Sequence, residues 1–177
     1  MIPEFTEKGC LPEGCHTCSI DEFKEKFVHD FKDSKSRKSR FEGFIEYSKY
    51  LKISIKKELS YLINGSFTTN KNNPNDIDFV ILFDLSILNS VDHVFFQNEV
   101  EKQIEKNIAR HKDLEKVKNK SMDIEDVYCC DWYPLYKTDP DDPQYEYYLE
   151  EKEYWLDLFK YSKEDSKNPK GIIKMKL

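Results

Sequence analysis

The stretch "NGSFTTNKNNPNDIDFV" (residues 64–80) decides the fold, because it joins two apolar runs through a polar loop. "LSYLIN" (59–64) is predicted to be a strand, and "DIDFVILF" (76–83) is predicted to be a second, more strongly β-prone strand. The second run otherwise has the composition of a buried strand, yet it holds Asp76 and Asp78 two residues apart. This acidic pair indicates a chemical role.

Side chains alternate along a strand, so Asp76 and Asp78 should emerge on one face while Ile77 and Phe79 point into the packing on the other. Two carboxylates about 4 to 5 Å apart, at an effective dielectric constant near 20, repel each other by roughly 3 to 4 kcal/mol. A bound divalent cation such as Mg²⁺ would relieve that repulsion.

A third acid is expected from "DIEDVYCCDWY" (123–133), which is predicted to be a strand. Asp131 would share a face with apolar side chains, where an acid is costly unless it has a function. Those neighbours are Val127, Cys129 and Tyr133. Asp123 and Asp126 are the alternatives for this position.

Gly65 and Ser66 close the first strand, where a residue without a β-carbon lets backbone N–H groups approach an anion and a hydroxyl can bind phosphate. Thr68, Thr69 and Lys71 in the loop could extend that contact. Each feature alone also has a structural explanation, since Gly–Ser is a common turn and the polar loop could simply be solvated.

The remaining segments complete a mixed α/β chain, a β-sheet flanked by helices. Helices are predicted over residues 19–31 with Ser19 as N-cap, 35–52, 91–112 and 145–162. Pro134 is expected to end the third strand, and "GIIKMKL" (171–177) to be an edge strand or a tail. The aromatic stripe of the 145–162 helix is more typical of a core than of an interface.

Composition indicates one domain, residues 1–177, with an N-terminal arm at 1–18. The chain is 38% hydrophobic and 35% charged, and it lacks a membrane-spanning run or a signal peptide, so we expect a cytoplasmic protein without membrane contact. A net charge of −6 argues against a broad surface for duplex DNA or RNA. This net charge is still compatible with a local basic groove.

Two other acid or thiol clusters are weaker metal sites. "CLPEGCHTC" holds Cys10, Cys15, His16 and Cys18, but a zinc site normally takes its second ligand pair from a distant segment. The five cysteines are expected to be reduced thiols. "KTDPDDP" (137–143) lacks the glycine and distal glutamate of a calcium loop, so an acidic turn is the better interpretation.

Gly65–Ser66, nine residues, then Asp76–Ile77–Asp78–Phe79 resembles the signature of the DNA polymerase beta-like nucleotidyltransferase superfamily. Three further short motifs are similar to those of a small bacterial and phage family within this superfamily: "LPEG.H" (11–16), "CDWYP" (130–134) and "KGI" (170–172). Asn64 stands where that family has aspartate. The resemblance covers nearly the whole chain.

The resemblance implies a nucleotidyltransferase-type sheet and transfer of a nucleoside monophosphate from a nucleoside triphosphate to an acceptor hydroxyl. It implies two Mg²⁺ ions, with Mn²⁺ as a substitute, held by three catalytic acids. The acids are Asp76, Asp78 and Asp131, and the triphosphate-binding residues are Gly65, Ser66, Thr69 and Lys71.

The acceptor is expected to be an RNA or protein hydroxyl. Small members of the superfamily modify antibiotics, proteins or, as toxins, tRNA; by that analogy a toxin or defence role with an antitoxin partner comes first. The alternative is a catalytically silent nucleotide-binding or interaction protein on the same scaffold.

Overall fold

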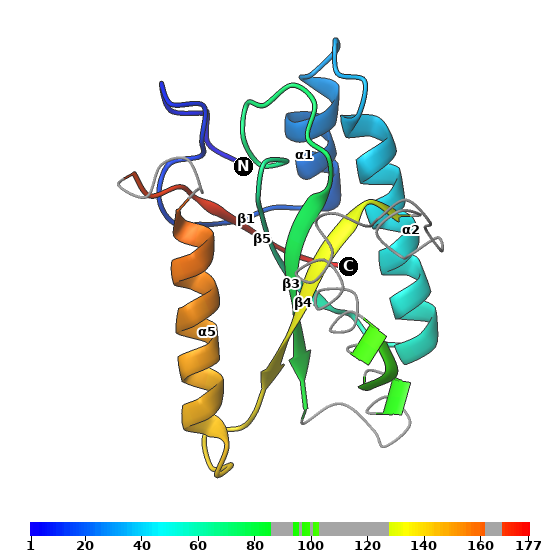
Figure 1. Ribbon diagram of the computed structural model, residues 1–177, viewed down its shortest axis with the longest axis vertical. Coiled ribbons are helices and arrows are strands. Elements are labelled where there is room, and N and C mark those ends of the chain that lie inside the picture. The colour runs from blue at the N-terminus through cyan, green and yellow to red at the C-terminus, as the bar shows by residue number, and fades with distance from the viewer. Residues whose placement is uncertain (86–93, 96, 100, 103–127, 162–167) are drawn as a thin grey trace, which may run out of the picture.

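The computed structural model of the chain describes residues 1–85, 94–95, 97–99, 101–102, 128–161 and 168–177 (Figure 1). Its centre is a mixed five-stranded sheet with the order β1-β5-β2-β3-β4. The strands are β1 (Cys15–Thr17), β2 (Ser60–Asn64), β3 (Ile77–Asp84), β4 (Cys130–Lys137) and β5 (Ile172–Lys176). β2 runs antiparallel to β3 and β5, whereas the pairs β3–β4 and β1–β5 are parallel. The predicted mixed α/β class is confirmed.

The helices are α1 (Ile20–Lys24), the π-helical turn η1 (Glu25–His29), α2 (Arg37–Ile55) and α5 (Tyr145–Lys160). Ser19 caps α1 through the predicted capping box, in which Glu22 N donates to Ser19 Oγ and Ser19 N donates to Glu22 Oε2. Within the described part of the chain, no helix has the length and apolarity to cross a bilayer. Most of the helix predicted over 91–112, together with Asp123, Asp126 and Val127, lies outside the described residues.

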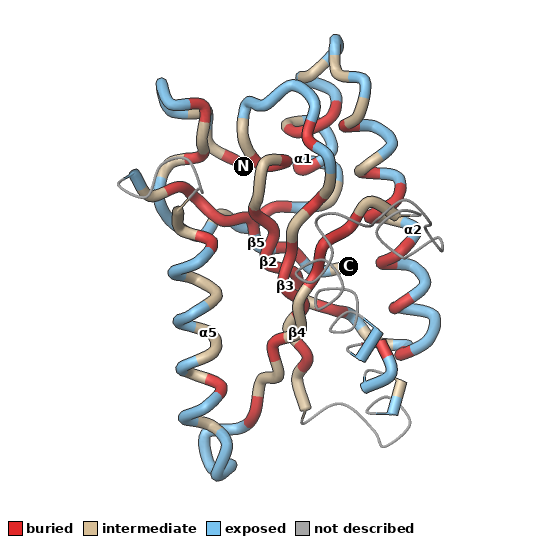
Figure 2. The backbone as a smooth tube through the Cα atoms, viewed as in Figure 1, coloured by how far each residue is buried: buried red, intermediate tan, exposed pale blue. Residues whose placement is uncertain are grey.

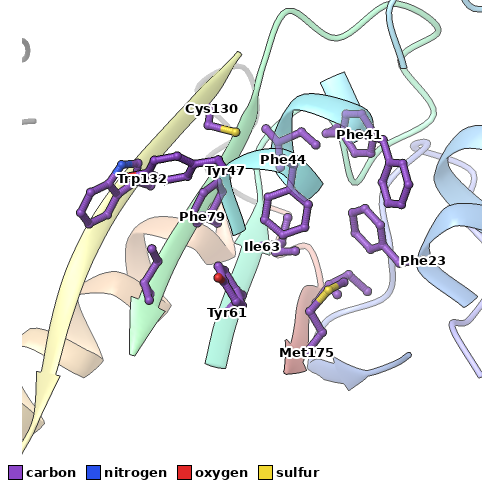
Figure 3. Close-up of a cluster of buried hydrophobic side chains, with 14 of the residues drawn as sticks. Phe23, Phe41, Phe44, Tyr47, Tyr61, Ile63, Phe79, Cys130, Trp132 and Met175 are labelled. Atoms are coloured by element: carbon purple, nitrogen blue, oxygen red, sulfur yellow. The ribbon is translucent and has the colours of Figure 1, made fainter. Parts of the chain in front are cut away.

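Helices cover both faces of the sheet, with α2 on one side and α5 on the other (Figure 1). The alternation of β3 assigns its side chains to the two layers: Ile77 and Phe79 belong to the larger core under α2, and Val80 to the smaller core under α5. Aromatic side chains fill the larger core (Figure 3), where Phe44 and Phe79 have ring centroids 5.1 Å apart. Each such buried ring contributes about 1.5–3 kcal/mol.

Two strand predictions were wrong. β4 does not end at Pro134 but continues to Lys137, because β4 is the last strand in the order and a proline lacking N–H is tolerated at an edge. The C-terminal segment is neither edge nor tail, since β5 lies between β1 and β2. The N-terminal arm supplies β1, which covers what would otherwise be the edge of β5.

The aromatic stripe of α5 divides between core and surface. Tyr148 and Phe159 are buried against the sheet, and the Trp155 ring lies 4.5 Å from that of Tyr133. Tyr147 and Tyr154 are each more than 60% exposed. Figure 2 shows the same division, with exposed and intermediate residues alternating along α5 and buried residues between them.

Candidate functional site

Asp78 and Asp131 are neighbours across the sheet. The parallel register of β3 and β4 places their Cα atoms directly side by side, and adjacent strands are about 5 Å apart. Residues paired in this way share a face, and the alternation continues with Val80 and Leu135 in the core under α5. Asp131 is buried, at 9% exposed, Asp78 is half-buried, and each is the second residue of its strand.

Six residues further along the same two strands, the same face carries a balanced pair. Asp84 lies in register with Lys137, and Lys137 Nζ forms an ion pair with its carboxylate. The register partner of Asp78 is instead another acid, Asp131. Near their start the two strands therefore set an acid beside an acid, and at their end an acid beside a lysine.

Asp76 is half-buried and lies immediately before β3, which begins at Ile77. It therefore enters the sheet at the same end as Asp78 and Asp131, although it is not itself part of the strand. All three predicted acids lie at the same end of β3 and β4, with Asp78 and Asp131 paired and Asp76 in the adjoining loop.

The Gly65–Ser66 bend lies beside these acids. Gly65 has a φ of +75°, and a β-carbon at this position would overlap Asp78 Oδ2. Its N–H donates to Asn64 Oδ1 at 2.6 Å and so does not face a phosphate. The glycine is required because it adopts a left-handed conformation and leaves room for the Asp78 carboxylate. Ser66, which is half-exposed, is the residue of the bend left to contact a ligand.

Asn64 was not predicted as part of the site. It pairs with Asp78 across β2 and β3, is 1% exposed, and its Nδ2 donates to Gly171 O at 3.2 Å. This bond joins the end of β2 to the start of β5 and brings Lys170, a 7% exposed lysine, to the same edge. No periodic pattern in the sequence marks either residue, because both depend on a contact across more than 100 positions.

Thr69 and Lys71 have different surroundings. Thr69 Oγ1 donates to Ser66 O at 2.8 Å and accepts from Lys71 N at 3.2 Å, so this hydroxyl stabilises the loop from within. The Lys71 side chain is exposed. Of the two, Lys71 is the one whose charged group can reach a ligand in solvent.

Arg37, at the start of α2, holds the 66–71 loop in place through hydrogen bonds to its backbone. Its guanidinium is fully buried, lies 3.6 Å from the centre of the Phe31 ring and makes five hydrogen bonds to backbone carbonyls. The carbonyls are those of Phe27, Phe67, Thr69 and Lys71. Burial lowers the pKa of Arg37 to about 10, which still leaves it charged at neutral pH. The sequence held no signal for this role.

The acids at the start of β3 and β4 do not form a closed metal cage. No group of three or more histidine, cysteine or acidic side chains in the described ranges forms a ready-made metal site, and this applies to Asp76, Asp78 and Asp131 as well as to the Cys10–Cys18 segment. Mg²⁺ is commonly held by one or two carboxylates together with substrate phosphates, and not by protein ligands alone. Asp78 and Asp131, with Asp76 beside them, supply carboxylates of that kind.

A hollow of about 250 Å³ lies elsewhere, beyond the opposite end of β4. Its lining includes Tyr136, Thr138, Tyr147 and Glu151, and none of the predicted site residues.

Residues 3–176 match the profile of a family of unknown function, DUF6932. No curated protein and no solved structure matches the chain. The chemistry of the site therefore has to be argued from its own residues.

Proposed function

We propose that this chain, which belongs to the DUF6932 family, is a metal-dependent nucleotidyltransferase that moves a nucleoside monophosphate from a nucleoside triphosphate to an acceptor hydroxyl. The observation that carries the proposal is the register pairing of Asp78 with Asp131, beside a Gly65–Ser66 bend that leaves room for the Asp78 carboxylate. A nucleotidyltransferase-type sheet is part of the same proposal.

In this reaction the acceptor oxygen attacks the α-phosphorus of the nucleoside triphosphate. A new P–O bond forms, the bond from the α-phosphorus to the bridging oxygen breaks, and pyrophosphate leaves with the electron pair. In this proposal Asp131, on β4, orients the acceptor hydroxyl and accepts its proton. Bound Mg²⁺ would neutralise charge on the phosphates and favour ionisation of the hydroxyl, with Asp76, Asp78 and Asp131 as its protein ligands.

In this proposal the loop that begins at Ser66 binds the triphosphate. The Ser66 hydroxyl and backbone can donate to a phosphate oxygen, and the exposed Lys71 can add a positive charge. Arg37 contributes from a distance, because its hydrogen bonds to Thr69 O and Lys71 O fix the path of the loop. It is a positioning residue and has no contact with substrate in this scheme.

The proposal is tested by incubating the protein with each of the four ribonucleoside triphosphates, labelled at the α- or γ-phosphate, with Mg²⁺ or Mn²⁺ and a cell extract. We expect α-label on an acceptor and γ-label only in pyrophosphate, which separates nucleotidyl transfer from phosphoryl transfer. Asp78→Asn and Asp131→Asn should each abolish transfer. Asp84→Asn is the matched control, since it removes an acid from the same face of β3 and should leave transfer intact.

Two outcomes would overturn the proposal. Transfer of γ-label in place of α-label would indicate a kinase. Retention of a nucleotide without transfer of either label, across extracts and metals, would favour a catalytically silent nucleotide-binding protein.

A further inference from the structure

A basic segment joins η1 to α2. Residues 32–40 contain five basic side chains and one acidic side chain, Asp33, in a chain whose net charge is −6. Lys32, Lys35 and Lys38 are exposed and Arg40 is half-exposed, so four of the five charges reach solvent. The contact of Lys38 with Glu42, at 3.9 Å between two exposed side chains, contributes little.

This segment is fastened to the loop that carries Ser66 and Lys71. Lys35 N donates to Asn73 Oδ1 at 2.7 Å, and Ser34 Oγ donates to the same atom at 3.3 Å. Arg37 holds the loop through its carbonyls, as described above. In Figure 1 the start of α2 and the loop between β2 and β3 lie at the same end of the molecule. The exposed Lys71 side chain adds a further positive charge on this loop.

The charges are placed at a cost to the free protein. They lie at the positive end of the α2 dipole, where the first turn holds no acid and Ser36 makes no side-chain capping hydrogen bond. A bound polyanion would relieve this repulsion. Elsewhere the charge is reversed: α5 carries five acidic and two basic residues. A polyanion would thus be steered to the end of the molecule where the candidate site lies.

We propose that the basic surface formed by Lys32, Lys35, Lys38, Arg40 and Lys71 binds the phosphate backbone of a single-stranded RNA that supplies the acceptor hydroxyl; this rests on the proposed function. A cluster of cations that includes four exposed lysines suits the negative charges of a nucleic acid. RNA offers a 2′-hydroxyl at every nucleotide as well as a terminal 3′-hydroxyl, so an acceptor group is available wherever the strand meets the site.

The test measures binding of a fluorescent RNA of about 12 nucleotides, a length suited to small single-strand-binding domains, by anisotropy with the full chain. Nucleotide and divalent cations are left out, so that binding is scored apart from catalysis. Lys35→Gln/Lys38→Gln is compared with Lys49→Gln/Lys52→Gln, which removes the same charge from exposed positions later in the same helix. We expect about tenfold weaker binding for the first pair, with a salt slope smaller by about 1.4 because two phosphate contacts are lost. The second pair should behave like the parent protein.

Absence of RNA binding at low salt, or an equal loss in both variant pairs, would overturn the proposal. So would tighter binding of a polyglutamate peptide through Lys35 and Lys38, which would indicate an acidic protein as acceptor. The two proposals fail separately. RNA binding without transfer of α-label in the earlier assay would refute the nucleotidyltransferase and leave the RNA surface, whereas labelling of a protein without RNA binding would do the reverse.

Discussion

Replacing Arg37 with alanine should destabilise the fold by about 3 kcal/mol. The change removes five hydrogen bonds, of which those to Phe27 O and Phe67 O are buried. A buried carbonyl left without a donor costs about 1–3 kcal/mol, so these two acceptors account for about 2–6 kcal/mol. Relief of the buried charge, and water entering the space, offset part of that cost. The acceptors on Thr69 and Lys71 are nearer solvent and add less.

The free energy of unfolding would be measured by urea denaturation, followed through the fluorescence of Trp132 and Trp155. Lys38→Ala is the matched control, because it removes the same charge from the next residue, whose side chain is 81% exposed. A surface change of this kind is expected to stay within about 0.5 kcal/mol. Arg37→Lys should fall between the two, since one ammonium cannot satisfy four carbonyls arranged around a guanidinium.

The same variants report on the loop directly. Trypsin cleavage after Lys71 should accelerate in Arg37→Ala under native conditions and stay unchanged in Lys38→Ala, because only Arg37 bonds to the carbonyls of the loop. If Arg37→Ala unfolded within about 1 kcal/mol of Lys38→Ala and its loop resisted trypsin equally well, the assignment of Arg37 as the clamp of the 66–71 loop would be wrong.

Three further results are expected. Mg²⁺ should raise the melting temperature of the parent protein, and at a concentration 100 times its Kd the rise should be equivalent to about 2.7 kcal/mol. Asp131→Asn should lose this rise, whereas Asp84→Asn should keep it. An unchanged rise in Asp131→Asn would exclude that acid as a ligand. Gly65→Ala should lower the free energy of unfolding by about 1–2 kcal/mol because alanine disfavours the left-handed backbone, and chemical denaturation would measure this. The same variant should also lose label transfer in the transfer assay, because Asp78 must move. Burial raises the pKa of Tyr61 to about 12, so the tyrosine of the unfolded chain loses its proton at a lower pH than that of the folded protein. The free energy of unfolding should therefore be highest below pH 10 and fall as the pH rises towards 12. A Tyr61→Phe variant with an equally steep fall, measured by urea titrations, would contradict this.

The parts of the fold that the sequence predicted correctly have local causes. The β2 and β3 strands follow from short apolar runs bounded by a polar loop, and the start of α1 follows from Ser19 and Glu22 alone. Alternation within each strand is also local, but the common face of Asp78 and Asp131 follows only from the register of β3 and β4. The start of β4 was less accurate, since Cys129 has a φ of +54° and precedes the strand.

The parts that could not be predicted depend on partners far apart in the chain. β5 is an inner strand only because β1 pairs with it from the other end of the sequence. Arg37 is read from sequence as one more cation in a basic run, and its burial appears only when the 67–71 carbonyls fold around it. Asn64 replaces an expected aspartate, yet its amide group serves two bonds, to Gly65 N and Gly171 O, that a carboxylate could not both make.

The pairing of Asp78 with Asp131 is enforced by the core and is not free to adjust. A slip of β4 by one residue would turn Asp131 towards α2 and expel Cys130 and Trp132, both fully buried, from the larger core. Each large buried side chain contributes about 1.5–3 kcal/mol, and burying a charge in its place would cost more. The hydrophobic pattern therefore fixes the register that sets Asp78 beside Asp131, which is the preorganisation that the proposed metal site would require.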